Sequence, residues 1–281
     1  MSRPSWVSLE EAVASVPSNC AISPGGFMLS RAPMALIFEL IRQHRRGLHI
    51  VSLPNPLPAE MLVAAGAASY VEFLFNALTL GGRVRSMPCL KRAIETGSIA
   101  WAEHDGFRIV QRFRAAAMGM PFLPVPDFGG SAVSAVDPLP RVEDPFTGKA
   151  VHVERPFYPD VALLHAPAAD EQGNLYIEDP TTDLLLAGAA RRIIATAEKR
   201  VSRIPHATIP SFMVDLVVEE PNGAYPTGCL GLYPADSSHL EAYLALAEQG
   251  RESEYLKTMV GGPGRRLVAP FQTSLAQEAV S

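Results

Sequence analysis

The sequence predicts an α/β protein with a doubly wound, mainly parallel sheet and helices on both of its faces. Two observations predict this fold class. Short apolar runs rich in β-forming residues alternate along the chain with segments whose apolar residues recur at helical spacing. Strands joined by crossover helices form a parallel sheet that is covered on both faces. Hydrophobic residues make up 48% of the 281 residues, so the chain can bury the core that such a sheet needs.

The first unit of the chain is predicted to be a strand, a tight loop and a helix. An apolar run, Cys20–Ile22, leads into Gly25 and Gly26, and Pro33 then opens a segment with apolar residues at helical spacing. Paired glycines add no side-chain bulk, so a ligand can approach the backbone and meet free N–H groups beside a helix N-terminus. We expect this loop to suit a phosphate or a developing oxyanion. A purely structural turn is the alternative.

The units that follow repeat this pattern. In the first half, β-forming runs predict strands at 48–52, 70–75 and 99–103, and composition or apolar spacing predicts helices at 34–41, 59–65, 90–96 and 107–118. In the second half, the same criteria predict strands at 160–166, 175–177, 193–197 and 213–219, a turn at 170–174, and helices at 184–190, 238–249 and 252–260.

Prolines recur between the two halves, from residue 121 to residue 159. Because proline lacks the N–H donor that a helix or a central strand needs, we expect mostly extended loop here, with a hairpin near Thr147 and Gly148. We therefore predict one α/β domain over residues 1–261 that carries a proline-rich insertion at 121–159. Residues 262–281 show no periodicity and are expected to form a tail or a partner-binding arm.

Charge and composition argue against several classes of protein. The net charge of −5 comes without a basic stripe, so a nucleic-acid partner is disfavoured. The most apolar window, 61–80, contains Glu72 and Asn76 between proline- and glycine-rich loops, so we interpret it as buried core and expect no membrane contact. The three cysteines are widely spaced and no apolar signal sequence precedes the first unit, so we expect a reduced cytoplasm.

A metal site is not expected from the spacing of the usual ligands. The seven histidines show no zinc-type spacing, and Cys20, Cys89 and Cys229 form no CxxC pair. Cys229 is either a reactive thiol or a buried small residue, and the second is the commoner case.

Three further groups are candidates for the site. Arg31 is placed to clamp a substrate carboxylate or a phosphate, or to form an ion pair. Glu103-His104-Asp105, at a predicted strand end before a helix, is the best acid/base cluster in the chain, with a capped helix start as the alternative. Phe128-Gly129-Gly130-Ser131 is either a second backbone-donor loop or a turn in the proline-rich connector.

Several of these segments carry a resemblance to a known family. Gly25-Gly26-Phe27 with Pro33 resembles the signature of the first subunit of family I coenzyme A transferases. Ala169-Asp170 with Gly173-Asn174 looks like the family's turn after the central strand, and the stretches 210–215 and 223–229 look like those of the glutaconate CoA-transferase type. Arg31 stands where many members have glycine, and is closer to the glutaconate-type variants, which include enzymes that hydrolyse or decarboxylate CoA esters.

The resemblance implies a mechanism that two unlike subunits share. In the family, the acyl-CoA thioester is attacked by a glutamate of the second subunit, which relays CoA through covalent intermediates. The family's serine-glutamate-asparagine-glycine motif around that glutamate is absent here. The resemblance thus implies an alpha subunit that works only together with a beta subunit, in a heterodimer or heterotetramer. It also implies a fold related to that of the sugar-phosphate isomerases, with CoA as acyl carrier and no permanently bound cofactor.

The expected site follows from the resemblance and the candidates together. Gly25, Gly26 and Glu103 are expected to be catalytic, with Glu103 as general base if the enzyme is a hydrolase or decarboxylase. The expected substrate-binding residues are Phe27, Ser30, Arg31, Gly129, Gly130 and Ser131. The net reaction, transfer, ring-opening hydrolysis or decarboxylation, stays open at this point. A non-catalytic metabolite-binding protein is the alternative from another class.

Overall fold

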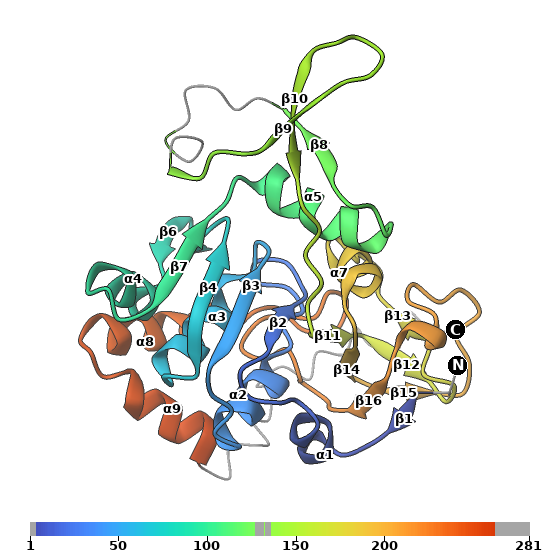
Figure 1. The fold of residues 1–281 in the computed structure, drawn as a ribbon. Helices are drawn as coiled ribbons and strands as arrows, with labels where there is room; N and C mark the ends of the chain where they lie inside the picture. Colours follow the sequence, from blue (N-terminus) through green and yellow to red (C-terminus); the bar gives the residue numbers. More distant parts are fainter. Residues whose placement is uncertain (1–3, 127–131, 133–135, 262–281) are drawn as a thin grey trace.

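An eight-stranded sheet runs through the centre of the molecule in the computed structural model, which describes residues 4–126, 132 and 136–261 (Figure 1). Its strand order is β1-β16-β14-β11-β2-β3-β4-β7, and each neighbouring pair runs parallel. The strands are β1 (Ser5–Trp6), β2 (Ala21–Pro24), β3 (Leu48–Ser52), β4 (Ala68–Phe73), β7 (Ala100–Glu103), β11 (Val161–Ala166), β14 (Ile193–Ala197) and β16 (Leu216–Glu219). The predicted fold class is confirmed.

Helices cover both faces of this sheet because its strands are apolar on both sides. In β11, Leu163 packs into one buried cluster and the next residue, Leu164, into the other, as the alternation of side chains along a strand requires. The first cluster receives α1 (Leu9–Ala14), α2 (Met34–Arg42), α3 (Pro56–Ala64), α4 (Pro88–Glu95), α8 (Ser237–Glu248) and α9 (Glu252–Gly261). The second receives α5 (Gly106–Ala117) and α7 (Asp183–Ala189).

The direction of winding reverses between β2 and β11. From β2 the chain proceeds through β3 and β4 to β7 at one edge, and from β11 it proceeds through β14 to β16 toward the other edge. In open α/β sheets, ligands bind outside the carboxyl ends of the strands at such a switch point. Gly25 and Gly26 directly follow β2, so their loop lies at this position.

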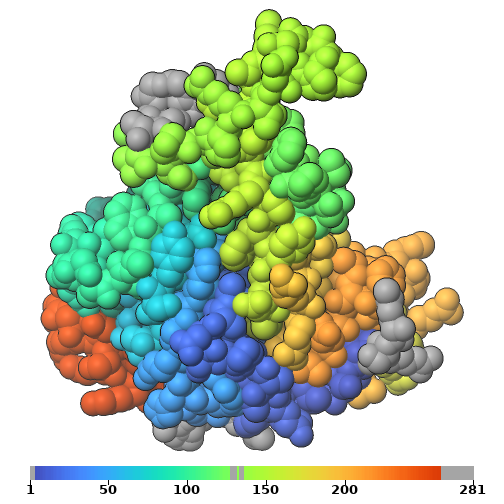
Figure 2. All heavy atoms as spheres, in the orientation of Figure 1, coloured from blue at the N-terminus to red at the C-terminus, as the bar shows by residue number. Residues whose placement is uncertain are grey.

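The proline-rich insertion contains more structure than the sequence predicts. Its described part forms a separate antiparallel sheet of β8 (Leu123–Val125), β10 (Ala150–Glu154) and β9 (Arg141–Glu143). The expected hairpin is present between β9 and β10, with Gly148 at φ +69°. This sheet stands out from the body of the molecule (Figure 2). The predicted loop at Gly129, Gly130 and Ser131, and the predicted arm at 262–281, lie outside the described residues.

Other differences arise where short strands pair locally. The apolar window 61–80 continues into a hairpin of β5 (Ala77–Leu80) and β6 (Arg83–Ser86), which turns at two glycines with positive φ. The predicted strand β13 (Leu175–Tyr176) belongs to a small sheet with β12 (Ala168–Asp170) and β15 (Arg200–Val201). The strands β12 and β15 were not predicted, and neither were α1 and β1. A short 3₁₀ helix, Ser211–Met213, delays the strand expected from residue 213. Among the described residues, no helix is long and apolar enough to cross a membrane.

Candidate active site

A buried ion pair holds the glycine loop at the switch point. Asp183, the first residue of α7, accepts a hydrogen bond from the N–H of Gly26 at 2.9 Å and another from Nη1 of Arg31 at 2.7 Å. The Arg31 side chain is 2% exposed and that of Asp183 is fully buried. Nη2 of Arg31 donates to the main-chain carbonyl of Asp179. Burial raises the pKa of the Asp183 carboxyl, and the charge of Arg31 and the N–H of Gly26 oppose that rise.

Both glycines are required by this packing. A Cβ at Gly25 would collide with a carboxylate oxygen of Asp183 and would lie 2.6 Å from Cδ2 of Leu164. Gly26 has φ +81°, and its Cβ would lie 2.5 Å from the carbonyl oxygen of Arg31. A side chain at either position would therefore displace the ion pair or the loop backbone.

The expected free backbone donors are not found at these two glycines. The N–H of Gly25 donates to the carbonyl of Leu163 at 2.8 Å, and that of Gly26 is occupied by Asp183. The amide of Asn55 also donates to the Gly25 carbonyl, at 2.5 Å. The loop is thus closed by partners that lie far away in the sequence. Contact of the substrate with Gly25, Gly26 and the ion-paired Arg31 stays a prediction.

The segment after β16 forms the second wall of the loop. The N–H of Arg31 donates to the carbonyl of Gly228 at 2.7 Å, and the N–H of Gly228 donates to the carbonyl of Leu29 at 2.8 Å. The stretches around 25–33 and 223–229, which the sequence connected by resemblance, therefore lie side by side. On the open side of the loop, Phe27 is 42% exposed and Ser30 is half-buried.

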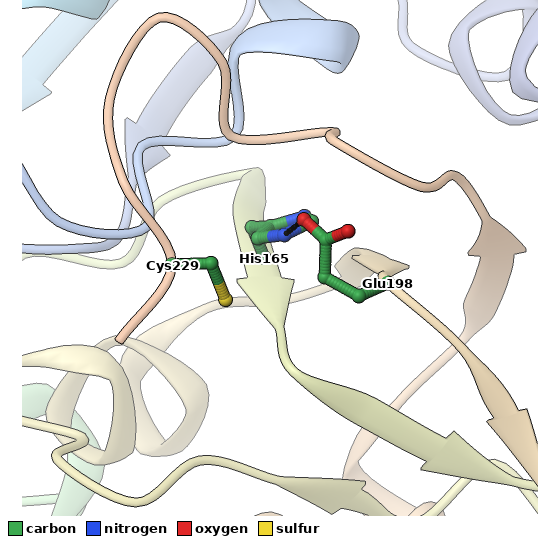
Figure 3. A group of neighbouring side chains, drawn as sticks. All are labelled: His165, Glu198 and Cys229. Carbon is green, nitrogen blue, oxygen red and sulfur yellow. Dashed lines mark hydrogen bonds and ion pairs between the residues drawn. The ribbon is translucent and has the colours of Figure 1, made fainter. Parts of the chain in front are cut away.

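A polar cluster behind this wall joins His165, Glu198 and Cys229 (Figure 3). Nε2 of His165 is 2.8 Å from Oε1 of Glu198, and its Nδ1 is 2.8 Å from the hydroxyl of Thr196. Oε1 of Glu198 also accepts a hydrogen bond from the hydroxyl of Tyr233. The three ligand atoms lie within 4.8 Å of one another, so this group can be considered as a metal site that the sequence spacing did not reveal.

The hydrogen bonds of this cluster favour a structural role. Both ring nitrogens of His165 already have partners, and Oε2 of Glu198 accepts the N–H of Asn222 at 2.6 Å. Burial, with the charge of Glu198, raises the pKa of the Cys229 thiol to about 12, so the thiol stays protonated and is a poor nucleophile and metal ligand. The buried alternative describes Cys229 in this structure.

The acid/base cluster 103–105 is divided by the structure. Asp105 caps α5 by accepting the N–H of Phe107 at 2.8 Å, as the capped-helix alternative proposed. Glu103 is exposed at the end of β7. Because β7 is three strands from β2, Glu103 lies on the order of 14 Å from the glycine loop. The structure does not bring the two together within this chain, and a catalytic role for Glu103 stays a prediction.

His104 belongs to a buried network around Glu72 that the sequence did not predict. Nε2 of His104 is 2.5 Å from one Glu72 oxygen and Nε2 of His49 is 2.8 Å from the other, while Arg112 donates to the first. Burial alone would raise the pKa of Glu72, but the bonds from His104, His49 and Arg112 and the Arg112 charge lower it well below its usual range. The only sequence signal was a glutamate inside an apolar strand.

Comparison with known proteins places this architecture in a family. Residues 7–220 match the coenzyme A transferase family. The chain belongs to that family. The glutaconate CoA-transferase of Acidaminococcus fermentans has the same fold, with a TM-score of 0.83, 28% identity and coverage of 91% of this chain and 88% of that one. In sequence, the corresponding subunit of that enzyme is 30% identical over 84% of this chain and 81% of its own length.

Other similar proteins carry different reaction names. A solved structure of the decarboxylase AibA/AibB is 61% identical, with a TM-score of 0.91, and the match covers 93% of this chain and 100% of that one. The cholesterol ring-cleaving hydrolase IpdA subunit of Rhodococcus jostii is 29% identical over 91% of this chain and 92% of its length. The chain also spans 59% of the length of an uncharacterised Archaeoglobus fulgidus protein that is 34% identical over 91% of this chain.

The first prediction concerns the Arg31–Asp183 pair. Asp183→Asn keeps the shape of the side chain but leaves the guanidinium of Arg31 buried without a counter-charge, so we expect it to lower the free energy of unfolding by about 3 kcal/mol or more. Asp179→Asn is the matched control, because Asp179 accepts from Arg31 only through its main chain. Denaturant unfolding of both variants measures the difference. Equal stability of the two variants would contradict the proposed importance of the pair.

The second prediction concerns the pH dependence of the Glu72 network. The pKa of Glu72 is lower in the folded protein than its usual value of 4.5. The ionised carboxylate therefore stabilises the fold fully above pH 4.5, and this stabilisation is lost as the pH falls below 4.5. We expect Glu72→Gln to lower the free energy of unfolding by about 3 kcal/mol at neutral pH, and by progressively less as the pH falls below 4.5. Urea unfolding across this pH range, with the exposed Glu95→Gln as control, gives the comparison. A pH-independent difference from wild type would show that the carboxylate charge does not stabilise the fold.

Proposed function

We propose that this chain is the alpha subunit of a two-chain enzyme that acts on acyl-CoA thioesters of a dicarboxylic acid, and that its net reaction is a decarboxylation. The observation that carries the proposal is the 61% identity to the decarboxylase AibA/AibB over the full length of that chain. The related CoA-transferase subunits A are 26–30% identical. Because the sequence identity to the decarboxylase is about twice that to the transferases, decarboxylation is favoured over CoA transfer.

The chemistry of the loop also favours a reaction completed by another chain. Among the described residues around the loop, Asp183 is held by Arg31 and Gly26, and Glu198 accepts hydrogen bonds at both of its oxygens. Neither carboxylate is free to attack a thioester. The glutamate motif of the family is absent from the sequence. The group that reacts with the substrate is therefore proposed to belong to the partner subunit.

Exposed apolar side chains support the presence of that partner. Phe27 on the glycine loop and Leu230, directly after the adjoining wall, are 42% and 55% exposed. Apolar patches on a soluble protein often mark interfaces. We propose that the beta subunit covers this region and brings the thioester to the loop, with CoA as substrate and no permanent cofactor. The widely spaced, buried free cysteines agree with the proposed reduced cytoplasm.

Each predicted site residue receives a role in this scheme. Gly25 and Gly26 let the loop pack closely against the Arg31–Asp183 pair, and Phe27 and Ser30 contact the substrate from the open side. Arg31 positions the loop through its ion pair, which is one of the two roles that the sequence left open. Gly129, Gly130 and Ser131 keep the substrate-binding role that the sequence predicts. Glu103 is proposed as the acid–base group, because its carboxylate is exposed at a strand end.

Decarboxylation assigns a definite task to such a group. The bond between the carboxylate and the carbon chain breaks, its electron pair moves toward the conjugated thioester, and CO₂ leaves. The carbon must then receive a proton, which Glu103 can deliver in its acid form. Transfer is the second candidate, because the match to the glutaconate CoA-transferase subunit covers 84% of this chain.

The third prediction separates decarboxylation from transfer. The complex co-expressed with its partner is expected to release CO₂ from the mono-CoA ester of an unsaturated dicarboxylic acid, and the isolated chain is expected to release none. Quantitative detection of ¹³C-bicarbonate from a labelled ester measures the reaction. Appearance of acetyl-CoA when acetate is added, without ¹³C-bicarbonate, would establish transfer instead. Borohydride trapping would then place the covalent adduct on the partner chain.

The fourth prediction tests Glu103. Glu103→Gln is expected to lower kcat of the complex by roughly a hundredfold, which is the usual contribution of general acid–base catalysis, with an unchanged melting temperature because the side chain is exposed. Glu95→Gln, on the solvent face of α4, is the matched control and should keep wild-type kinetics. Wild-type kcat in Glu103→Gln would remove Glu103 from the mechanism.

A further inference from the structure

The loop that follows β2 contains a small hairpin. Phe27 and Ser30 exchange two main-chain hydrogen bonds, each of 2.8 Å, so Met28 and Leu29 form a two-residue turn between them. Met28 has φ +52°, and a positive φ at the first turn residue is typical of tight hairpins. The ends of this hairpin are fixed, because the residues on either side of it contact the buried carboxylate of Asp183.

One main-chain N–H group of this loop has no acceptor. Buried and half-buried N–H groups usually have partners, and six of the seven from Gly25 to Arg31 do. That of Met28, for example, donates to the carbonyl of Pro54 at 2.6 Å. The N–H of Leu29 has no acceptor among the described residues. Because the reciprocal bonds of the hairpin use the groups that point inward, the N–H groups of its turn point outward.

A second donor without a partner lies on the next residue. The hydroxyl of Ser30 forms no hydrogen bond with the described residues, and it is open to water because its oxygen is not enclosed. Phe27, directly opposite Ser30 in the hairpin, is 42% exposed, and side chains of opposite residues lie on the same face. This part of the loop thus offers two unoccupied donors and an apolar surface.

The chemistry of these donors selects the group that they bind. Donors held on a fixed backbone stabilise an oxygen that gains negative charge, because they need not reorient as the charge develops. In decarboxylation, the electron pair of the broken carbon–carbon bond moves toward the thioester and places charge on its carbonyl oxygen. In transfer, attack at the carbonyl carbon places charge on the same oxygen. Both candidate reactions therefore need donors at this atom.

We propose that the N–H of Leu29 and the hydroxyl of Ser30 hydrogen-bond the thioester carbonyl oxygen of the substrate, with Phe27 against its apolar part. They replace the free glycine donors that the sequence predicts. The identification of this oxygen rests on the proposed function, whereas the presence of two unoccupied donors does not. Gly25 and Gly26 contribute by fixing the hairpin, through packing that leaves no room for a Cβ at either position.

Kinetics of the complex co-expressed with its partner test the side-chain donor, with release of ¹³C-bicarbonate and formation of acetyl-CoA both measured. Ser30→Ala removes the hydroxyl and is expected to lower kcat roughly a hundredfold with KM nearly unchanged, because the hydrogen bond strengthens as charge develops. Ser30→Thr keeps the hydroxyl and should retain most of the wild-type kcat. Ser202→Ala removes an exposed hydroxyl directly after β15 and is the matched control.

The main-chain donor requires a change in the backbone itself. Leucic acid, introduced at position 29 by nonsense suppression, replaces the N–H with an ester oxygen and keeps the side chain of Leu29. We expect kcat to fall by roughly a hundredfold. Leu139, between two prolines of the insertion, also has an N–H without an acceptor among the described residues. Leucic acid at position 139 is therefore the matched control and should leave kcat unchanged.

Three results in an active wild-type complex would overturn the proposal. These are a wild-type kcat in folded Ser30→Ala, a wild-type kcat with leucic acid at position 29, and a loss that appears only in KM. Thermal melting reports folding, and the position-29 ester decides the question if Ser30→Ala does not fold. A wild-type complex that forms neither ¹³C-bicarbonate nor acetyl-CoA would instead contradict the proposed function, and this inference with it.

Discussion

The buried ion pair between Arg31 and Asp183 is the contact on which the loop at the switch point depends. Removing two charges from water is costly, and the cost is offset only when each charge is well hydrogen-bonded. Here the carboxylate also accepts the N–H of Gly26, and the guanidinium also donates to the carbonyl of Asp179. The pair joins the loop after β2 to the start of α7, across the two oppositely wound halves of the sheet. It therefore fixes a backbone that has positive φ at both Gly26 and Arg31.

The same constraint extends to the wall formed after β16. Backbone hydrogen bonds join Arg31 and Leu29 to Gly228, and Glu198 binds both Asn222 and Tyr233 within that wall. His165 connects Glu198 to the end of β11 through Thr196. These buried polar contacts satisfy one another, so the wall is rigid and offers few unused donors. The residues that look chemically reactive in the sequence, such as Cys229, serve here as packing.

Local periodicity was sufficient to predict most strands and helices, the glycine loop and the cap at Asp105, because each depends on residues close together in the sequence. It could not predict Asp183 as the partner of Arg31, since 152 positions separate them and a single aspartate at a helix start has an ordinary capping explanation. The Glu72 network was not predicted for the same reason, because its members come from β3, β4, α5 and the residue after β7. The expectation of free N–H groups at the two glycines failed for this reason: the acceptor that occupies Gly26 is distant in sequence.

The two polar regions of the sheet differ in what remains unsatisfied, and this difference divides their roles. At the loop, Arg31, Asp183 and both glycine amides have partners within the chain, so a ligand there gains little by replacing them. Beside α5, Nδ1 of His104 and Nε of Arg112 are buried without a partner among the described residues, and the charged hydrogen bonds of these side chains to Glu72 offset that cost. The loop is thus held by contacts within the chain, which fix its backbone before any ligand arrives. The Glu72 network instead joins β3 and β4 to α5, so its role is to hold that half of the sheet together.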